Sequence, residues 1–388
     1  MYTKVRIGKF KGRKGKNKLR FFLGSKWWQL GIEDKWFWKG KRRLRFIGSK
    51  IQLLEKIKEV TDRHAPNAEI FCDIFSGSSA VARYFKQWFQ IYSNDLLYFS
   101  YCLQMATIEN DEYPRFEGLK KVIGMDSPLD YLNGLSDKEM EILPQELRFF
   151  QNNYSPKGGR MYITDSNALR IDFARNTIEK WKNNGFLTEL EYYYLVACVI
   201  EGIPFVSNIS GTYGAFHKHW DKRASKKFEL FELEVTHNNK NNKCYNQDGV
   251  ELLKHISGDI LYIDPPYNGR QYISNYHVLE TAAAYDSPEL RGVTGQRPAK
   301  NQKSTFCSKA TVLESFEMLI ANAKFEHIVL SYNTDGIMKI GDIEIIMKKY
   351  GISDTFEINY IPHRRFKSRN ATITEELKEM LVYIKKVV

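Results

Sequence analysis

Short apolar runs recur along this chain of 388 residues, and three of them carry an aspartate at or near the carboxyl end. Runs of this length that are rich in β-branched or aromatic residues predict buried strands. Helical spacing of apolar positions separates them, as over residues 51–60 and 80–89. The alternation predicts an α/β protein with a doubly wound, Rossmann-like sheet. The predicted strands cover residues 70–75, 91–95, 260–264, 327–332 and 381–387.

The middle of the chain has a different pattern. Between about residues 110 and 242 it consists of helical segments and polar loops, with the longest predicted helix over residues 187–203. No β-α-β rhythm is visible there, which is typical of an inserted module. We expect residues 111–244 to form a mostly helical insert in a domain made of residues 44–110 and 245–388.

The clearest candidate for chemistry follows the apolar run 260–263, where Asp264, Pro265, Pro266 and Tyr267 stand in succession. A proline pair cannot continue a ladder, so the strand ends at Asp264, on the edge where open α/β sheets bind ligands. The carboxylate and the Pro265 carbonyl can both face one amino group while Tyr267 covers the ring that carries it. This arrangement fits a flipped adenine or cytosine. The alternative is a strand-ending turn with a surface tyrosine.

This motif resembles the catalytic motif of the S-adenosylmethionine-dependent amino-group DNA methyltransferases, specifically the N6-adenine branch. The order of motifs is similar to that of the Dam-like, D12 class, in which a donor-binding motif precedes a target-recognition insert. The resemblance covers about residue 44 to the C-terminus. It implies a methyltransferase sheet with an inserted target-recognition domain, acting on double-stranded DNA in a restriction-modification system, with a cognate restriction endonuclease as a candidate partner.

The resemblance also implies a donor-binding motif ahead of the first strand. Phe46, Gly48 and Lys50 match it: the ring packs, the glycine lets the backbone approach closely, and the lysine offers a positive charge to the methionine carboxylate. The resemblance places Asp264 between the methyl donor and the target base, so we expect it to be a donor-binding residue as well as a catalytic one.

The strand-turn-helix after residue 70 is a weaker signal, because it holds one firm glycine where a dinucleotide fingerprint has three. By resemblance, Asp73, Phe75 and Gly77 form the turn under the methionine part of the donor. Asp95 ends the next strand 22 residues after Asp73, where an acid that holds ribose hydroxyls is expected. Asp248 resembles the position that recognises the donor's adenine, with a solvated loop acid as the alternative.

Several other stretches are candidates for contact with DNA. Residues 207–223 combine glycines, aromatic residues, amides and bases, which suits base reading in a groove and equally a packed loop. Residues 363–369 are a basic patch suited to gripping phosphates. Residues 286–305 are typical of a mobile loop. Residues 268–277, including His277, and residues 331–333 are expected to line the wall of the base pocket.

Composition limits the cellular location and the cofactors that are expected. No apolar run approaches the roughly 18 residues that span a bilayer, and the five cysteines show neither close pairing nor metal-ligand spacing with histidines. We expect a reduced, cytoplasmic monomer without a metal. The chain's net charge is +12, yet residues 1–45 hold 16 Lys or Arg against two acids, +14, so the remainder carries −2. Affinity for DNA must therefore depend on local patches.

Residues 1–43 carry most of the charge excess and show no clear periodicity, so we expect no independent fold there. Two hypotheses follow. The segment is a basic arm that adds nonspecific DNA affinity, or it is an upstream stretch that is dispensable or not made, with Leu44 marking an alternative start.

Three other functions remain open. Cytosine-N4 methylation shares the architecture, although serine is commoner than aspartate at the position of Asp264 in that branch. An RNA or protein-glutamine methyltransferase fits less well, because the glutamine enzymes favour asparagine there and lack a long insert. A catalytically silent DNA-binding module is the rival from another class, against which the intact Lys50, Asp264 and Tyr267 argue.

Overall fold

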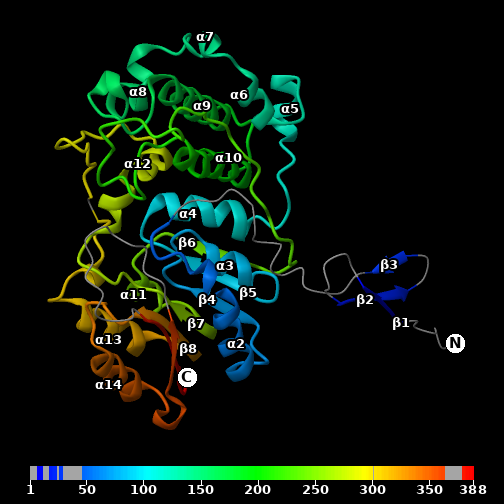
Figure 1. Cartoon of the computed structure of the whole chain (residues 1–388), viewed down its shortest axis with the longest axis vertical. Coiled ribbons are helices and arrows are strands. Elements are labelled where there is room, and N and C mark those ends of the chain that lie inside the picture. The colour runs from blue at the N-terminus through cyan, green and yellow to red at the C-terminus, as the bar shows by residue number, and fades with distance from the viewer. Residues whose placement is uncertain (1–6, 12–16, 24–25, 29–45, 300, 363–377) are drawn as a thin grey trace. The chain divides into compact units, whose positions relative to one another are not determined.

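A seven-stranded sheet with the order β6-β5-β4-β7-β8-β10-β9 forms the centre of residues 44–388 (Figure 1). The computed structural model describes residues 7–11, 17–23, 26–28, 46–299, 301–362 and 378–388. The five strands from β6 to β8 are parallel, and β10 runs antiparallel to both β8 and β9. The strands are β4 Ile70–Asp73, β5 Gln90–Asn94, β6 Lys243–Tyr245, β7 Ser257–Ile263, β8 Lys324–Asn333, β9 Glu357–Pro362 and β10 Lys378–Lys385.

The sheet confirms the predicted mixed α/β class, and each strand predicted from an apolar run overlaps an observed one. In β7, Ile260 to Ile263 are fully buried, as parallel strands covered on both faces require. Strands β6 and β9 were not predicted. They lie at the two edges of the sheet, where the apolar signal is weakest because one side of the strand has no partner.

The strand order reverses between β4 and β7. From β4 the chain moves to β5 and later to β6 on one side, whereas β7 and β8 extend the sheet on the other side. Asp73, the last residue of β4, lies in register with Tyr262, two residues before Asp264. In open α/β sheets a crevice forms outside the carboxyl ends of the strands at such a reversal. The fold therefore brings Asp73 and Asp264 to the edge of one crevice.

Two layers of helices flank the sheet. Figure 1 shows α13 and α14 toward one end of this unit and the helices of residues 111–244 toward the other, with α4 between those helices and the sheet and α12 beside α10. The helices outside the insert are α2 Leu54–His64, α3 Ala80–Phe85, α4 Tyr98–Gln104, α11 Gly249–Leu252, α12 Tyr272–Ala284, α13 Val312–Asn322 and α14 Ile340–Tyr350.

Residues 111–244 are helical up to residue 205 and irregular after it, and they share one hydrophobic core with α4 and α12. Helix α10 is the helix predicted over 187–203. Helix α9 is longer, and its apolar periodicity is obscured because it buries Arg170, Asp172 and Arg175. The insert helices are α5 Glu117–Ile123, α6 Pro128–Gly134, α7 Asp137–Met140, α8 Phe149–Asn153, α9 Asp165–Asn183 and α10 Glu189–Gly202.

The segment 286–305, predicted as a mobile loop, is anchored along its length. Arg160 of the insert donates to the carbonyls of Gly292 and Val293 at 3.1 Å each. Arg297 is almost completely buried and pairs with Asp286 at 2.8 Å. This expectation was wrong, because composition records the glycines and prolines of a turn but not the donors that a distant segment supplies to its carbonyls.

Residues 1–43 form a separate unit. Its described part is an antiparallel sheet of β1 Ile7–Lys11, β2 Asn17–Leu23 and β3 Lys26–Trp28, with β2 in the centre. The sequence predicted no strands here. Across the described parts of both units, the helices are all too short or too polar to cross a bilayer.

Arg175 of α9 connects residues 111–244 to α12, and its replacement tests this contact. Its fully buried guanidinium donates to the Ala282 carbonyl at 2.7 Å at the end of α12 and pairs with Glu179 at 2.7 Å. Arg175→Met leaves these acceptors unpaired, so the free energy of unfolding is expected to fall by about 3–5 kcal/mol. Denaturant unfolding measures this. In the control Arg63→Met, a half-exposed ion pair with Glu357 is lost, and the expected change is below about 1 kcal/mol. Equal losses would contradict the assignment.

Candidate active site

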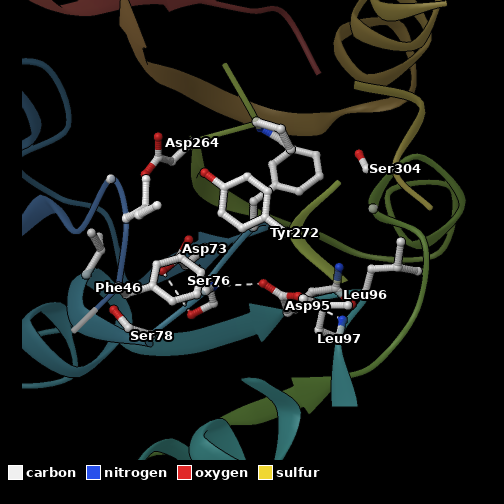
Figure 2. A pocket seen from close by; sticks show the side chains of 18 of the residues that line it. Phe46, Asp73, Ser76, Ser78, Asp95, Leu96, Leu97, Asp264, Tyr272 and Ser304 are labelled. Carbon is white, nitrogen blue, oxygen red and sulfur yellow. Dashed lines mark hydrogen bonds between the residues drawn. The ribbon is translucent and has the colours of Figure 1, made fainter. Parts of the chain in front are cut away.

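A solvent-open cavity lies at the carboxyl ends of β4 and β7, and the empty space in and around its mouth is about 950 Å³. Figure 2 shows Asp73, Asp95 and Asp264 around it, with the rings of Phe46 and Tyr272 between them. Of the predicted site residues, Pro265 is buried and does not line it. The others all do: Phe46, Gly48, Lys50, Asp73, Phe75, Gly77, Asp95, Asp248, Asp264, Pro266 and Tyr267. The structure therefore brings together residues that are up to 221 positions apart in sequence.

The turn after β4 is built around Asp73. Its Oδ2 accepts from the Ser76 hydroxyl at 3.1 Å and from the Ala82 amide at 3.2 Å, while its Oδ1 has no hydrogen-bond partner. Burial, and then the nearby charge of Asp264, raises the pKa of Asp73 to about 8. Asp73 is therefore largely protonated near neutral pH, and it can both donate and accept inside the cavity.

Gly77 is required by two features of this turn. Its φ is +52°, in the left-handed region, and a Cβ there would lie 2.8 Å from the Phe46 ring. Phe46 is held in place because its ring stacks on Tyr276 with centroids 4.6 Å apart. The predicted packing role of Phe46 is thus visible as one wall of the cavity, built on the glycine turn.

Asp95 braces the same turn from the next strand. Its Oδ2 accepts from the Gly77 amide and its Oδ1 from the Leu97 amide, both at 2.8 Å. Burial raises the pKa of Asp95 to about 6, partly offset by these two bonds. Each oxygen keeps a second lone pair, so the predicted contact with ribose hydroxyls stays open. Asp248 caps α11 through the Val250 amide at 2.9 Å, a structural role beside the predicted one.

Asp264 occupies the centre of the charged part of the site. Its Oδ1 accepts a hydrogen bond from the Tyr267 hydroxyl and lies 3.3 Å from the Lys50 ammonium. Burial raises the pKa of Asp264 to about 6, against the lowering effects of Lys50 and Tyr267. Near neutral pH the group is therefore largely a carboxylate, and its side chain, 19% exposed, can accept hydrogen bonds from a ligand in the cavity.

The Lys50 side chain is 3% exposed, and its ammonium contacts three other side chains of the protein. It donates to the Tyr267 hydroxyl and lies within ion-pair distance of Asp264 and of Glu379, the latter at 3.5 Å. An ammonium has three N–H groups, so a further carboxylate would have to displace one of these partners. The predicted contact between Lys50 and the donor's methionine carboxylate stays a prediction.

Sequence reasoning missed Glu379 and Tyr262. Glu379 lies on β10, 115 positions after Asp264, and only the register of an antiparallel strand brings it here. Tyr262 is a buried member of the apolar β7 run, yet it is one of the residues that line the cavity. In the sequence, Glu379 is an acid just ahead of the predicted strand 381–387, and Tyr262 is a tyrosine two residues ahead of Asp264. Neither position can be assigned to the site until the order of the strands is known.

Other predicted contacts are only partly realised. Gln271 and Tyr272 line the cavity, but His277 does not: it is fully buried, its Nε2 lies 2.9 Å from the Tyr213 carbonyl, and burial lowers its pKa to about 4. Its assignment to the pocket wall was wrong, because the helix turns that side chain into the insert. Tyr332 on β8 packs edge-on against Tyr267, with centroids 5.2 Å apart. The basic patch 363–369 lies outside the described residues.

The lining of the cavity suits a polar ligand. Three buried polar atoms on residues that line it have no hydrogen-bond partner: the Ser49 hydroxyl, Asp73 Oδ1 and the Tyr262 hydroxyl. Unpaired buried polar groups are costly, so such a set indicates a missing partner. Gly48, at φ +77°, keeps the cavity side of its backbone free of a Cβ. S-adenosylmethionine has matching hydroxyls, amines and a carboxylate.

A mostly parallel sheet with an acidic, aromatic cavity where the strand order reverses is typical of α/β proteins that bind a nucleotide-like cofactor. Residues 46–346 match the family described as D12 class N6 adenine-specific DNA methyltransferase, and the chain belongs to that family. All residues that line the cavity lie within this range, whereas Glu379, which lies 3.5 Å from Lys50, is outside it.

Curated relatives support the same family. Type II methyltransferase M.FokI of Planomicrobium okeanokoites is 49% identical over 346 residues, 88% of this chain and 53% of that protein. Modification methylase StsI of Streptococcus sanguinis is 43% identical over 344 residues, 88% of this chain and 52% of that protein. The chain thus spans about half the length of these two. Type II methyltransferase M.NlaIII of Neisseria lactamica is 36% identical over 330 residues, 84% of this chain and 93% of that protein.

The Gly77 turn gives a test of the cavity that needs no catalysis. In Gly77→Ala the new Cβ displaces the Phe46 ring, so binding of S-adenosylmethionine, measured by calorimetry, is expected to weaken about tenfold or more, or at least about 1.4 kcal/mol. Gly124→Ala is the matched control, since Gly124 has φ +66° but open space around its Cβ position. It shares the backbone strain and is expected to bind the donor normally. Equal weakening in both variants would count against the cavity as the donor site.

Proposed function

We propose that the chain transfers a methyl group from S-adenosylmethionine to N6 of an adenine flipped out of double-stranded DNA, as the modification enzyme of a restriction-modification system. The observation that carries this proposal is Asp264, a largely buried carboxylate just after β7, on the wall of a cavity with a polar and aromatic lining. Membership of the N6-adenine family supports the choice of base.

The chain's own residues supply binding and orientation. When bound, S-adenosylmethionine supplies an electrophilic methyl group. Phe46 and the Gly77 turn form the wall for its methionine part, Asp95 faces its ribose, and Asp248 stands near its adenine. These assignments are proposals that follow from the resemblance and from the lining of one cavity.

The target amine is a poor nucleophile, because its lone pair is delocalised into the ring. Hydrogen bonds from the amine to Asp264 and to the Pro265 carbonyl would favour a pyramidal nitrogen and localise the lone pair. As N6 becomes methylated, positive charge develops on it. A buried carboxylate stabilises that charge more strongly than water would. No covalent intermediate is needed.

Replacement of Asp264 tests the chemistry directly. Asp264→Ala removes the acceptor for the target amine, so methyl transfer to DNA is expected to fall by at least about 10²–10³-fold. Donor binding, measured by calorimetry, is expected to weaken but remain detectable. The assay counts labelled methyl groups in DNA and identifies the product nucleoside, expected to be N6-methyldeoxyadenosine. Near-native turnover by the variant would show that Asp264 is not catalytic, and N4-methyldeoxycytidine would identify the alternative base.

The raised pKa of Asp264 predicts the direction of the pH dependence. The carboxylate form is the active one, and it is lost as pH falls through about 6. Since kcat/KM reports groups of the free enzyme, kcat/KM for DNA is expected to rise with pH up to about 6 and then to level off. Initial rates between pH 5 and 8 at constant ionic strength measure this. A rate that falls as pH rises through 6 would contradict the assignment.

For contact with DNA, the structure favours one part of residues 207–223. The first half packs inward: Asn208 and Tyr213 are buried, and the Asn208 amide donates to the His217 carbonyl at 3.0 Å. Residues 217–222 are exposed and hold a tryptophan, two lysines and two histidines. This exposed tip is where we expect phosphate contacts, and the packed half serves as its base.

Charge removal at this tip tests the expectation. In the double variant Lys218→Ala/Lys222→Ala, each lost phosphate contact lowers the slope of log affinity against log salt by about one, so a slope lower by about two is expected. The control, Lys56→Ala/Lys254→Ala, removes two exposed lysines that form ion pairs within α2 and next to α11. Fluorescence anisotropy with a DNA duplex measures both. Identical slopes in the two double variants would place the DNA elsewhere.

A further inference from the structure

Glu379 reaches the site from outside the segment that the family comparison covers. It lies on β10, in register with Asn333 on β8 and Ile361 on β9, whereas the family match ends at residue 346. Its side chain is 7% exposed and its Oε2 accepts no hydrogen bond among the described residues. A buried carboxylate with an unsatisfied oxygen is costly, so a compensating role is expected of it.

The charge that Glu379 faces is Lys50. The Lys50 ammonium lies 3.5 Å from Glu379 Oε2 and 3.3 Å from Asp264 Oδ1, so it stands between the two carboxylates and is tightly bound to neither. A close charge-assisted hydrogen bond would be about 2.7–2.9 Å long. Lys50 is itself almost completely buried, so water cannot replace either partner.

This arrangement sets the charge of the catalytic group. One ammonium and two carboxylates carry a net charge of −1, whereas Lys50 and Asp264 alone would form a neutral pair. We propose that Glu379 is a positioning residue for methyl transfer, which draws Lys50 away from a complete ion pair with Asp264 and so leaves negative charge available to the target amine. The inference rests on the proposed function, because it concerns the positive charge that develops on the methylated nitrogen.

The other groups around Asp264 do not supply this effect. Asp73 has a pKa raised to about 8, so it adds little negative charge near pH 7, and the tyrosine hydroxyls remain protonated because burial raises their pKa. Glu379 acts in the opposite direction to Lys50 on Asp264 and raises its pKa. The titratable and charged groups that face Asp264 are Lys50 ahead of α2, Asp73 on β4, Tyr262 on β7, Tyr267 in the turn, Tyr272 on α12 and Glu379 on β10.

The test is the pH profile of Glu379→Gln. Without the second carboxylate, Lys50 pairs fully with Asp264. The acid limb of the pH profile, which is the rise of the rate as Asp264 loses its proton, is therefore expected to move to lower pH by about one unit. At pH 7.5 kcat is expected to fall about tenfold, the equivalent of one pKa unit. The KM values for donor and DNA are expected to stay within about threefold. Glu379→Asp keeps the charge on a shorter side chain, and its acid limb is expected to lie between those of the wild type and Glu379→Gln.

Glu357→Gln is the matched control. Glu357 is a carboxylate on the neighbouring strand β9 that pairs with Arg63 and His64 away from the cavity, and its loss is expected to leave rate and acid limb unchanged. An acid limb that stays in place in Glu379→Gln, or an effect confined to the KM for donor, would overturn the proposal. If Glu379→Gln fails to fold, Glu379→Asp decides the question. An acid limb at the same pH as in the wild type would then overturn the proposal. Failure of the proposed function is a different result: the wild type itself would then transfer no methyl group to DNA.

Discussion

The placement of the buried Lys50 ammonium between Asp264 and Glu379 is the interaction on which the rest of the site depends. A carboxylate with two prolines behind it has to be buried to act strongly on an amine, and burial alone would keep it protonated. Lys50, placed ahead of α2, and the Tyr267 hydroxyl limit that effect, so the pKa of Asp264 rises only to about 6. The ion pair also joins the N-terminal end of the described catalytic unit to the sheet centre and, through Glu379, to β10.

The order of the strands explains why these residues meet. Because the strand order reverses between β4 and β7, the carboxyl ends of both strands open into one crevice. The turn after β4, fixed by Asp95 and Gly77, forms one wall, and the turn after β7 carries Asp264 and Tyr267 on the other. The insert reaches the same region indirectly: Arg160 holds the segment 286–305, whose end supplies Gln302 and Ser304 to the cavity. Arg160 thus connects residues 111–244 to a segment that helps to line the cavity.

Much of this could be predicted from the sequence, and the remainder could not for identifiable reasons. Apolar runs located the central strands, and the residues from Phe46 to Tyr267 that were assigned to the site all line one cavity, apart from the buried Pro265. Glu379 and Tyr262 escaped because their position depends on strand register and on a buried hydroxyl, which local patterns do not encode. His277 and the segment 286–305 were misjudged because the insert supplies their partners: Tyr213 for the histidine, and Arg160 for the loop carbonyls.

The central claim is that Asp264, held as a carboxylate by Lys50, directs methylation to the N6 amine of adenine. Long-read sequencing of DNA from a methylation-deficient host that expresses the chain reports base, sequence context and strand in one measurement. N6-methyladenine is expected at one recurrent sequence in cells with the wild-type chain, and none is expected in cells with Asp264→Ala. N4-methylcytosine, or adenine methylation that persists in the variant, would contradict it.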